Sequence, residues 1–404
     1  FTLSVMPHEL QEFRKQEILK SWVRSRPESV TSGLESLHSS CGAENFIFPV
    51  FISDSGNEHM VEPIHALPGQ FRFGTESVVE YLQPLVDEYE LKAVILFGVV
   101  DEEYRRDKDP EGSLADAVNH PSATGQSYVN PVCRALRRLK SAFGDRLLLI
   151  ADVCLCSYTS TGHCGIMTTV DNVLAPDTQK SHKRLSQVAV TYAQHGADII
   201  APSDMIIGRI RPMREALDAS GFPSVPIMSY AVKYCSAFYG PFRSAVSSTL
   251  TSPEALQRQM ETVDETSAHS PSNATQLSTL PRFHEKNAKK YFDRSSYQLH
   301  PATSTETLCR IVKNDVSHGA AFVMVKPSVC YMDVVHRVSQ VVEVPVGVYH
   351  TSGEYCQLYY AAQHNAIDLS ISLDELVTAY RRAGATFIIS YFTPFLLRKM
   401  KGKG

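Results

Sequence analysis

The sequence predicts an α/β protein that folds as a (β/α)8 barrel, also called a TIM barrel, with an N-terminal arm and a long insertion between strands five and six. Eight short apolar runs rich in β-branched residues stand out along the 404-residue chain. Runs of this kind are typical of strands buried on both faces. Helical stretches lie between most of them, and strands that alternate with helices indicate βαβ units and a parallel sheet.

The elements follow one another in a regular order. The expected strands begin at Phe46, Ala93, Arg146, Ala197, Val225, Ala320, Val344 and Thr386, and expected helices include 183–195, 210–220, 305–318 and 372–383. The segments "HGADIIAPS", "HGAAFVMVKPS" and "AGATFIISYF" repeat a unit in which glycine, suited to the left-handed conformation, ends a helix before a strand. This repeat, and the lack of a G-x-G-x-x-G after any expected strand, favour a barrel over a dinucleotide-binding sheet.

Two segments lie outside the repeat and define the expected domains. Residues 1–45 are expected to form an arm with a short helix around Leu10–Val23, and residues 46–404 to form the barrel domain. Within the barrel, residues 249–292 are polar and rich in serine and threonine. This stretch is too long for an ordinary connection, so we expect either a lid region or a mobile insertion.

The bulk properties exclude several classes of partner. A net charge of −4 and a pI near 6.4 provide no basic footprint for nucleic acid or an anionic membrane. No apolar run approaches the roughly 18 residues that span a bilayer, and the first residues contain no signal-peptide core. We therefore expect neither a nucleic-acid nor a membrane partner, and a cytoplasmic location with reduced thiols. An organellar location after removal of a leader stays open.

Polar and reactive residues gather where a TIM barrel places its active site. In such barrels the reactive groups lie at the C-terminal ends of the strands. Residues of this kind occur at the expected ends of strands three to eight: Asp152, Cys154, Cys156, Ser203, Asp204, Lys233, Lys326, His350, Ser352 and Tyr391.

Cys154, Cys156 and Cys164 form the pattern C-x-C-x7-C at the end of the third expected strand. On an extended segment the side chains of Cys154 and Cys156 point the same way, and Cys164 can return to them through a turn. Three thiolates with an open fourth position suit a catalytic Zn²⁺, and sulfur ligands disfavour Mg²⁺ and Ca²⁺. Buried structural thiols or redox thiols remain an open alternative, although a C-x-x-C redox pair is not present.

Lys233 and Lys326 each follow an apolar strand, and the two strands are expected to be neighbours. Burial disfavours an ammonium group and each amine would lower the pKa of the other, which yields a neutral amine able to form a Schiff base with a ketone. A lysine paired with a carboxylate or a phosphate is the alternative. Arg243, Arg294 and Gln298 flank the insertion. The two guanidinium groups suit bidentate binding of a substrate carboxylate, unless they are surface arginines.

The sequence also resembles a known family. The segments "DVCLCSYTSTGHCG", "APSDMIIGRI", "SYAVKYCSAFYGPFR", "YQLHPA", "VMVKPSVCYMDVV", "VYHTSGEY" and "ISYFTPFLLRKM" are similar, in this order, to the porphobilinogen synthases, or δ-aminolevulinic acid dehydratases. The resemblance implies a hydro-lyase that condenses two 5-aminolevulinate molecules into porphobilinogen, with loss of two waters, for haem and other tetrapyrroles. It also implies a homo-octamer and a catalytic zinc ion, and it leaves Mg²⁺ open as an allosteric ion.

The resemblance assigns expected functions to individual residues of this chain. The matches are Lys233 and Lys326 for the Schiff-base lysines; Cys154, Cys156 and Cys164 for the zinc ligands; Arg243, Arg294 and Gln298 for the receptor of one substrate carboxylate; Ser352 and Tyr391 for the receptor of the other; and Asp152, Ser203, Tyr239 and Phe242 for the metal-side pocket.

The sequence departs from the family pattern at several positions. Ile207 stands where relatives usually carry aspartate, and Ser296 where some carry an additional zinc-binding cysteine. Two other functions stay open. A Schiff-base aldolase acting on a phosphorylated sugar needs one lysine but leaves the three cysteines unexplained, and a zinc-dependent assembly barrel would tolerate the loss of both lysines.

Overall fold

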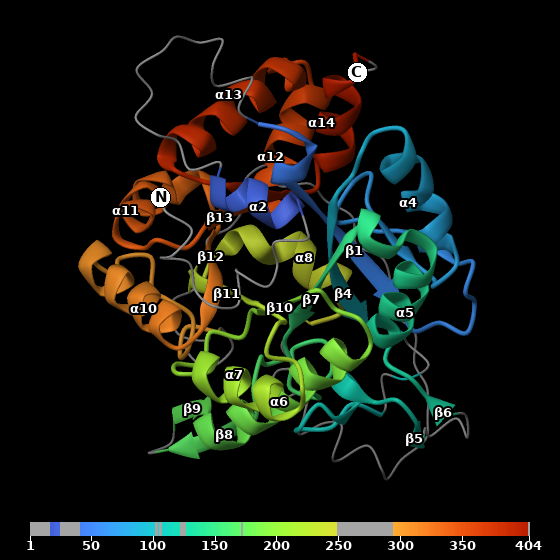
Figure 1. Ribbon diagram of the computed structural model, residues 1–404, viewed down its shortest axis with the longest axis vertical. Coiled ribbons are helices and arrows are strands. Elements are labelled where there is room, and N and C mark those ends of the chain that lie inside the picture. The colour runs from blue at the N-terminus through green and yellow to red at the C-terminus, as the bar shows by residue number, and fades with distance from the viewer. Residues whose placement is uncertain are drawn as a thin grey trace, which may run out of the picture.

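Eight parallel strands close into a barrel in the computed structural model, which describes residues 17–24, 41–101, 104, 107–121, 127–170, 173–248 and 294–402. The order of pairing around the barrel is β1-β4-β7-β10-β11-β12-β13-β14, and β14 pairs back with β1. The predicted TIM barrel is thus confirmed (Figure 1). The strands are β1 (Phe46–Ser53), β4 (Ala93–Val99), β7 (Leu148–Val153), β10 (Ile199–Pro202), β11 (Ile227–Lys233), β12 (Ala320–Lys326), β13 (Val346–His350) and β14 (Phe387–Ser390).

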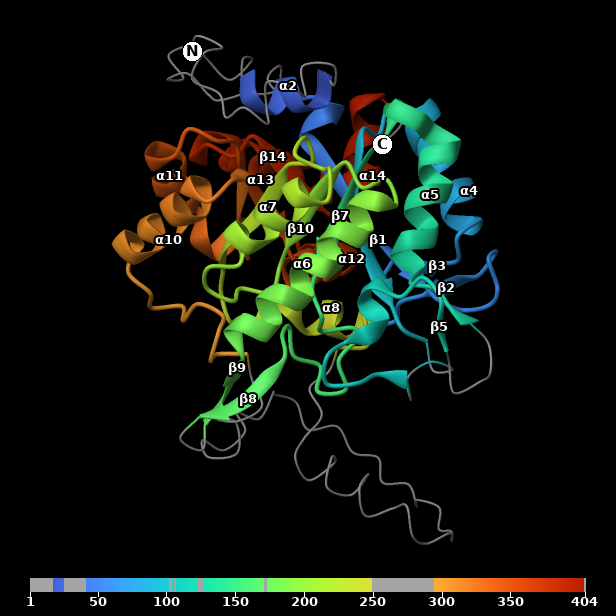
Figure 2. The same cartoon turned by 60° about the horizontal axis from the view of Figure 1, so that its bottom comes forward.

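Helices surround the barrel and connect its strands (Figures 1 and 2). The four expected helices correspond to α6, α7, α10 and α13, each within a few residues of the predicted ends. The helices are α4 (Ser77–Asp87), α5 (Pro131–Phe143), α6 (Thr178–Gln194), α7 (Ile210–Ala219), α8 (Gly240–Ala245), α10 (Thr305–Ser317), α11 (Met332–Val341), α12 (Ser352–Gln363), α13 (Leu369–Ala383) and α14 (Thr393–Met400).

Pairs of short strands lie in the loops that connect the barrel elements. The strand pairs are antiparallel, and β3 also pairs with β1. The pairs are β2 (Val61–Pro63) with β3 (Phe71–Phe73), β5 (His120–Pro121) with β6 (Ser127–Tyr128), and β8 (Met167–Val170) with β9 (Val173–Pro176).

The repeated glycines end their helices as the sequence predicts. Gly196, Gly319 and Gly384 have φ angles of 99°, 104° and 104°, which are left-handed values that favour glycine. Each glycine is followed within a few residues by a barrel strand. The repeat therefore marks three helix-to-strand junctions of the barrel.

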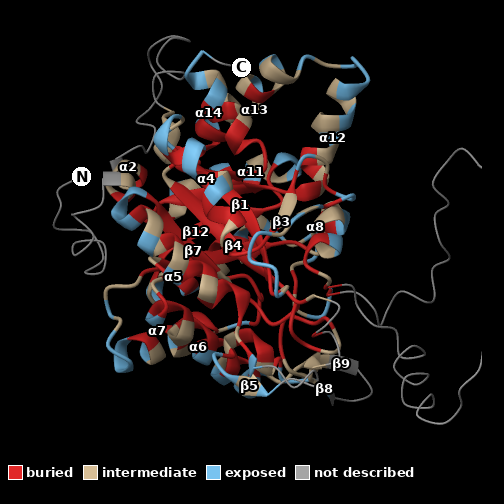
Figure 3. Cartoon of the chain, turned by 90° about the vertical axis from the view of Figure 1, so that its right-hand side faces the viewer, coloured by how far each residue is buried: buried red, intermediate tan, exposed pale blue. Residues whose placement is uncertain are grey.

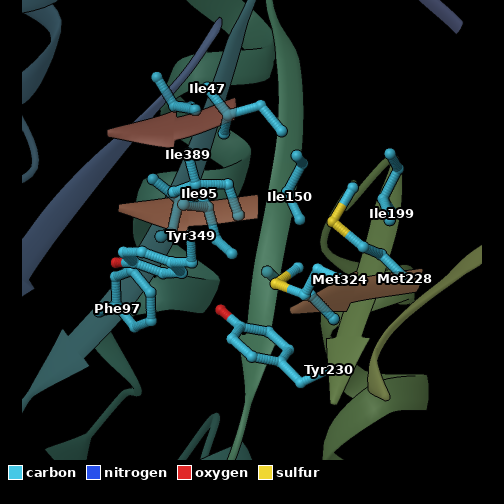
Figure 4. Close-up of a cluster of buried hydrophobic side chains, with 14 of the residues drawn as sticks. Ile47, Ile95, Phe97, Ile150, Ile199, Met228, Tyr230, Met324, Tyr349 and Ile389 are labelled. Carbon is cyan, nitrogen blue, oxygen red and sulfur yellow. The ribbon is translucent and has the colours of Figure 1, made fainter. Parts of the chain in front are cut away.

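The barrel interior forms the hydrophobic core. Every residue of β1, β4, β11 and β12 is buried, which explains why these strands have continuous apolar sequences rather than alternating ones. Figure 3 shows the strands as the most buried part of the molecule. Figure 4 shows the interior layers, where Ile47, Ile95, Ile150 and Ile199 contribute branched side chains. Full burial of one such side chain contributes about 1.5–3 kcal/mol.

The arm residues that the structure describes pack against the N-terminal end of the barrel (Figure 2). Helix α2 (Glu17–Arg24) carries Trp22, whose ring centroid lies 5.5 Å from that of Phe322 and 4.8 Å from that of Phe387. Trp22 Nε1 also donates a hydrogen bond of 2.6 Å to the carbonyl of Glu44. The indole therefore anchors α2 through both apolar and polar contacts.

Two predictions about the chain's organisation fall partly or wholly outside the described residues. The helix expected around Leu10–Val23 overlaps α2, but its first residues are not described. The insertion at 249–292 lies wholly outside the described residues, so the division into arm, barrel and insertion stays a prediction. Within the described ranges, no helix combines the length and apolarity needed to cross a membrane.

Candidate active site

A pocket opens at the C-terminal ends of the barrel strands. About 580 Å³ of its volume is not filled by atoms, and part of this space is open to solvent. Most of the residues predicted for the site line it: Asp152, Cys154, Cys156, Cys164, Ser203, Lys233, Tyr239, Phe242, Arg243, Arg294, Gln298 and Lys326. The remaining lining residues are Phe97, Gly98, Ser157, Tyr158 and Ser248.

Lys233 and Lys326 end neighbouring strands and lie directly opposite each other in the pairing of β11 with β12. Both side chains are buried. The pKa of Lys326 is lowered to about 7, mainly by burial and also by the nearby positive charge of Lys233. The neutral amine, which is the reactive form, is therefore far more accessible near pH 7 at Lys326 than at an ordinary lysine.

Aromatic rings surround the Lys326 amine. Its Nζ lies 3.9 Å from the ring centroid of Tyr349, 4.8 Å from Phe242, 5.3 Å from Tyr239 and 5.4 Å from Tyr230. The ring faces can stabilise the ammonium form, but they also exclude water from it. The lowered pKa of Lys326 shows that the loss of water outweighs this stabilisation of the ammonium form.

Asp152 lies near both lysines and completes a charged cluster. Burial raises the pKa of Asp152 to about 6, and the positive charges of Lys233 and Lys326 oppose this rise. Ser203 connects the group, since its Oγ donates a 3.1 Å hydrogen bond to Asp152 Oδ2 and its backbone carbonyl accepts one from Lys233 Nζ. The cluster can thus exchange protons between a carboxylate and two amines.

The three cysteines of the C-x-C-x7-C pattern converge as predicted. The Sγ atoms of Cys154, Cys156 and Cys164 all lie within 4.8 Å of one another, and the three side chains are buried. Hydrogen bonds from Cys154 and Cys156 hold the pKa of Cys164 well below its usual range, whereas the pKa of Cys154 lies well above it. Thiolate character on clustered sulfurs is what a soft metal ion selects.

Two arginines face the same pocket next to the thiols. Arg294 is buried, and its Nη2 donates 2.8 Å hydrogen bonds to the carbonyls of Gly162 and Ser248. Among the residues that the structure describes, the buried Nε atoms of Arg243 and Arg294 and the Oε1 of Gln298 have no hydrogen-bond partner. Buried polar atoms normally have a partner, so these groups indicate a site for a polar or anionic group.

The comparison with protein families decides the chain's identity. The model described as delta-aminolevulinic acid dehydratase matches residues 23–277 and 282–399. The chain belongs to the delta-aminolevulinic acid dehydratase family. This match includes much of the 249–292 segment, where it is interrupted at residues 278–281.

Individual relatives of this dehydratase family agree with the family match. The chain is 38% identical to a delta-aminolevulinic acid dehydratase from Bos taurus over 90% of this chain and 92% of the relative. It is 36% identical to one from Methanothermobacter thermautotrophicus over 87% of this chain and 89% of the relative. A solved dehydratase from Toxoplasma gondii, in complex with the reaction product porphobilinogen, superposes with a TM-score of 0.72 at 28% identity and covers 93% of each chain.

Ser352 and Tyr391, which are also predicted for the dehydratase site, are not among the residues that line the pocket. Ser352 Oγ accepts a 3.0 Å hydrogen bond from the backbone N–H of Phe242 and donates one of 3.2 Å to the carbonyl of Phe238. The Tyr391 hydroxyl hydrogen-bonds that of Tyr349 at 3.2 Å. Ser352 and Tyr391 thus reach the lysine only indirectly, each through a residue whose ring lies against Lys326.

Sequence reasoning missed several residues next to the dehydratase lysines. Tyr230 and Tyr349 lie against Lys326, but their positions inside apolar strands made them look like ordinary core. Tyr297 accepts a 3.2 Å hydrogen bond from the backbone N–H of Cys164 and contacts His163 Nδ1 at 3.1 Å. Its neighbour Gln298 was predicted, so proximity in sequence was the only available signal.

The departures from the dehydratase pattern lie on the surface. Ile207 is 84% exposed, which is unusual for a large apolar side chain, and its carbonyl accepts a 3.0 Å hydrogen bond from His182. Ser296 is also exposed. Neither residue lines the pocket described above.

The lowered pKa of Lys326 predicts the pH dependence of its reactivity. The rate at which a ketone substrate forms a reducible adduct with Lys326 should rise as pH increases through about 7, because the neutral amine reacts. In a Lys233→Met variant the midpoint should move to higher pH, since the charge of Lys233 helps to lower the pKa. Borohydride trapping across a pH series, with the exposed Lys313→Met as control, measures both midpoints. A midpoint that stays or falls in Lys233→Met would contradict this coupling.

Proposed function

We propose that this chain is a porphobilinogen synthase that condenses two molecules of 5-aminolevulinate into porphobilinogen and releases two waters. The observation that carries the proposal is the pair of buried lysines, directly opposite each other in a pocket that also contains three converging thiols. The membership of the family supports the same reaction. An aldolase would need only one of the lysines and would leave the thiols without a function.

Each lysine would hold one substrate molecule as an imine. The amine nitrogen attacks the ketone carbon, a carbon–nitrogen bond forms, and the ketone oxygen leaves as water. The neutral form of Lys326 is available for this attack near pH 7. Two imines on neighbouring strands hold the two substrates side by side, which replaces a bimolecular encounter by an oriented one.

Asp152 and Ser203 would move protons during these steps. Their hydrogen bond links a carboxylate to the end of β10, next to both amines. A carboxylate near two amines can accept a proton from one group and return it to another. Tyr239 and Phe242 would exclude water from the imines, which hydrolyse readily, because their rings lie 5.3 Å and 4.8 Å from Lys326 Nζ.

Cys154, Cys156 and Cys164 would hold a catalytic zinc ion. Their sulfurs are close enough to bind one ion, and an all-sulfur set suits zinc rather than magnesium. A bound zinc ion supplies Lewis-acid polarisation of an oxygen and a lowered pKa of bound water. The protein part of this site is the fixed arrangement of the three thiols beside the lysine pair.

The arginines and Gln298 would bind the carboxylate of one substrate, and Ser352 and Tyr391 that of the other. Arg243 and Arg294 line the pocket, and their Nε atoms bond no other residue in the described part of the chain, which supports the first receptor. Ser352 and Tyr391 hydrogen-bond Phe242 and Tyr349, two of the residues whose rings surround Lys326. Binding of the second carboxylate by Ser352 and Tyr391 would therefore require their side chains to rearrange. The family resemblance further suggests a homo-octamer in the cytoplasm and an allosteric Mg²⁺.

Replacement of Arg243 by lysine tests the first carboxylate receptor. Lysine keeps the charge but loses the planar fork, so KM for 5-aminolevulinate should rise by about tenfold or more, the scale of one charge-assisted hydrogen bond. The value of kcat should change little. Steady-state kinetics beside the exposed control Arg211→Lys measure the difference, and an unchanged KM would remove Arg243 from the receptor.

The proposed function itself is tested by product formation. The purified protein is incubated with 5-aminolevulinate, with and without a chelator, and the pyrrole product is measured. We expect about two substrate molecules consumed per porphobilinogen and loss of activity in the chelator. Cleavage of a phosphorylated sugar without any pyrrole product from 5-aminolevulinate would show instead that the lysines serve an aldolase.

A further inference from the structure

Strand β11 does not pair regularly with β12. Ser229 lies opposite Val323, and Val232 lies opposite Val325. Between these two pairs β11 contains two residues and β12 only one. An extra residue in one strand of a pair is a β-bulge, and bulges often occur next to active sites, where they change the direction of a side chain. We refer to Tyr230–Ala231 as the bulge.

The bulge determines where Lys233 points. In a regular strand, residues three apart lie on opposite faces of the sheet, so Tyr230 in the barrel interior would leave Lys233 facing the helices. Continued regular pairing from Ser229 would also place Lys233 opposite Pro327 rather than Lys326. With the bulge, Lys233 lies opposite Lys326. Its Nζ lies 5.7 Å from the Tyr230 ring centroid, and Figure 4 shows that ring inside the barrel.

Arg209 binds the bulge from the side of the helices. Arg209 is buried and directly precedes α7. Its Nη2 donates hydrogen bonds of 3.2 Å to the backbone carbonyl of Tyr230 and of 3.2 Å to Ser229 Oγ. A bulge disrupts the hydrogen bonding of the strand pair, and a buried carbonyl requires a donor. The guanidinium provides this donor at the bulge.

Two buried carboxylates hold Arg209 in place. Asp204 Oδ2 lies 3.4 Å from its Nε, and Asp315 Oδ2 lies 3.7 Å from its Nη2. Ser229 Oγ in turn donates a 2.7 Å hydrogen bond to Asp315. Asp204 follows β10 and Asp315 belongs to α10. The network therefore connects the bulge to two other elements through an arginine that is charge-paired on both sides, as a buried charge requires.

We propose that Arg209 is a positioning residue for the lysine pair: it holds the bulge and thereby keeps Lys233 level with Lys326 inside the barrel. This inference rests on the proposed function, because it assigns Arg209 a consequence for imine formation. Lys326 belongs to β12, which has no extra residue at this position. Loss of the bulge should therefore displace Lys233 more than Lys326.

Site-resolved imine trapping in an Arg209→Lys variant tests this inference. Lysine keeps a positive charge between Asp204 and Asp315 but loses the fork that reaches the Tyr230 carbonyl. With 5-aminolevulinate and borohydride, the trapping rate at Lys233 should fall by about tenfold or more, since small misplacements of a reacting group are costly. The rate at Lys326 should change by less than about threefold, a difference that a general loss of stability would not produce.

The matched control is Arg214→Lys. Arg214 is a second buried arginine, within α7, and it bonds Asp218, Val225 and Phe222 rather than the bulge. Its replacement should lower both trapping rates equally or not at all. If Arg209→Lys leaves the ratio of trapping at Lys233 to trapping at Lys326 as it is in the unaltered protein, the inference is overturned while the proposed function stays intact. Absence of imines at both lysines in the unaltered protein would instead reject the proposed function.

Ser229→Ala keeps the inference testable if Arg209→Lys does not fold. This variant removes the Ser229 hydroxyl that Arg209 and Asp315 share, but it retains both charges and the bond to the Tyr230 carbonyl. The hydroxyl is one of the two contacts of Arg209 at the bulge, so the trapping rate at Lys233 should fall by about two- to tenfold, the scale of one hydrogen bond, with the rate at Lys326 unchanged. An unaltered ratio of the two rates in Ser229→Ala would contradict the positioning function.

Discussion

Replacement of Lys326 by methionine should lower turnover of 5-aminolevulinate by at least about 10⁴-fold, on the scale of losses seen when an enzyme loses its covalent nucleophile. Lys326 is the amine whose pKa is lowered to about 7 and whose Nζ is surrounded by aromatic rings. Methionine has a similar length but cannot form an imine. Steady-state product formation measures the loss, and the exposed Lys313→Met should retain full activity.

The same variant should remain folded. Burial penalises the ammonium form of Lys326, which is why its pKa is low. In the unaltered protein the unfolded chain binds this proton more tightly than the folded one. The free energy of unfolding of the unaltered protein should therefore rise with pH between about 7 and the ordinary lysine pKa. An apolar side chain removes this penalty, so the melting temperature near pH 7 should not decrease. Normal turnover in Lys326→Met would show that the assignment of the imine is wrong.

Replacement of Cys156 by alanine should abolish stoichiometric zinc binding and nearly all activity. The variant removes one of three converging sulfurs and leaves a two-thiol site, which binds zinc far less tightly. Freshly purified, reduced wild-type protein should contain about one zinc ion per active site by elemental analysis. Cys356→Ser, which changes a half-buried thiol that does not line the pocket, should retain both zinc and activity.

Reconstitution separates zinc from magnesium at this site. Protein stripped of metal by a chelator should regain activity with Zn²⁺ and not with Mg²⁺, because thiolates select soft ions. Full activity of the stripped protein with Mg²⁺ alone would contradict a zinc function for the three cysteines. Retention of zinc by Cys156→Ala would place the ion elsewhere.

The sequence was sufficient to predict the barrel because each of its strands carries a strong local signal. Continuous apolar runs mark strands buried on two faces, and Gly196, Gly319 and Gly384 mark three junctions. The convergence of Cys154, Cys156 and Cys164 could also be predicted, because a C-x-C on an extended segment places two thiols on one side. These inferences depend on short-range geometry, which sequence spacing reports directly.

The features that sequence could not reveal depend on register and on long-range packing. The bulge at Tyr230–Ala231 breaks the alternation of β11, so simple periodicity would place Lys233 on the wrong face. The Arg209 network joins residues more than 100 positions apart along the chain. Tyr349 stacks near Lys326 only because β12 and β13 are neighbours in the closed barrel.

Peptide mapping of the unaltered protein after borohydride reduction in the presence of 5-aminolevulinate tests directly whether the two lysines capture substrate. We expect substrate adducts at Lys233 and at Lys326, with Lys326 the more readily labelled near pH 7 because of its lowered pKa. Labelling should disappear when borohydride is omitted, because imines hydrolyse. Adducts at neither lysine, or equal labelling of exposed lysines such as Lys313, would show that the buried lysine pair does not capture the two substrates.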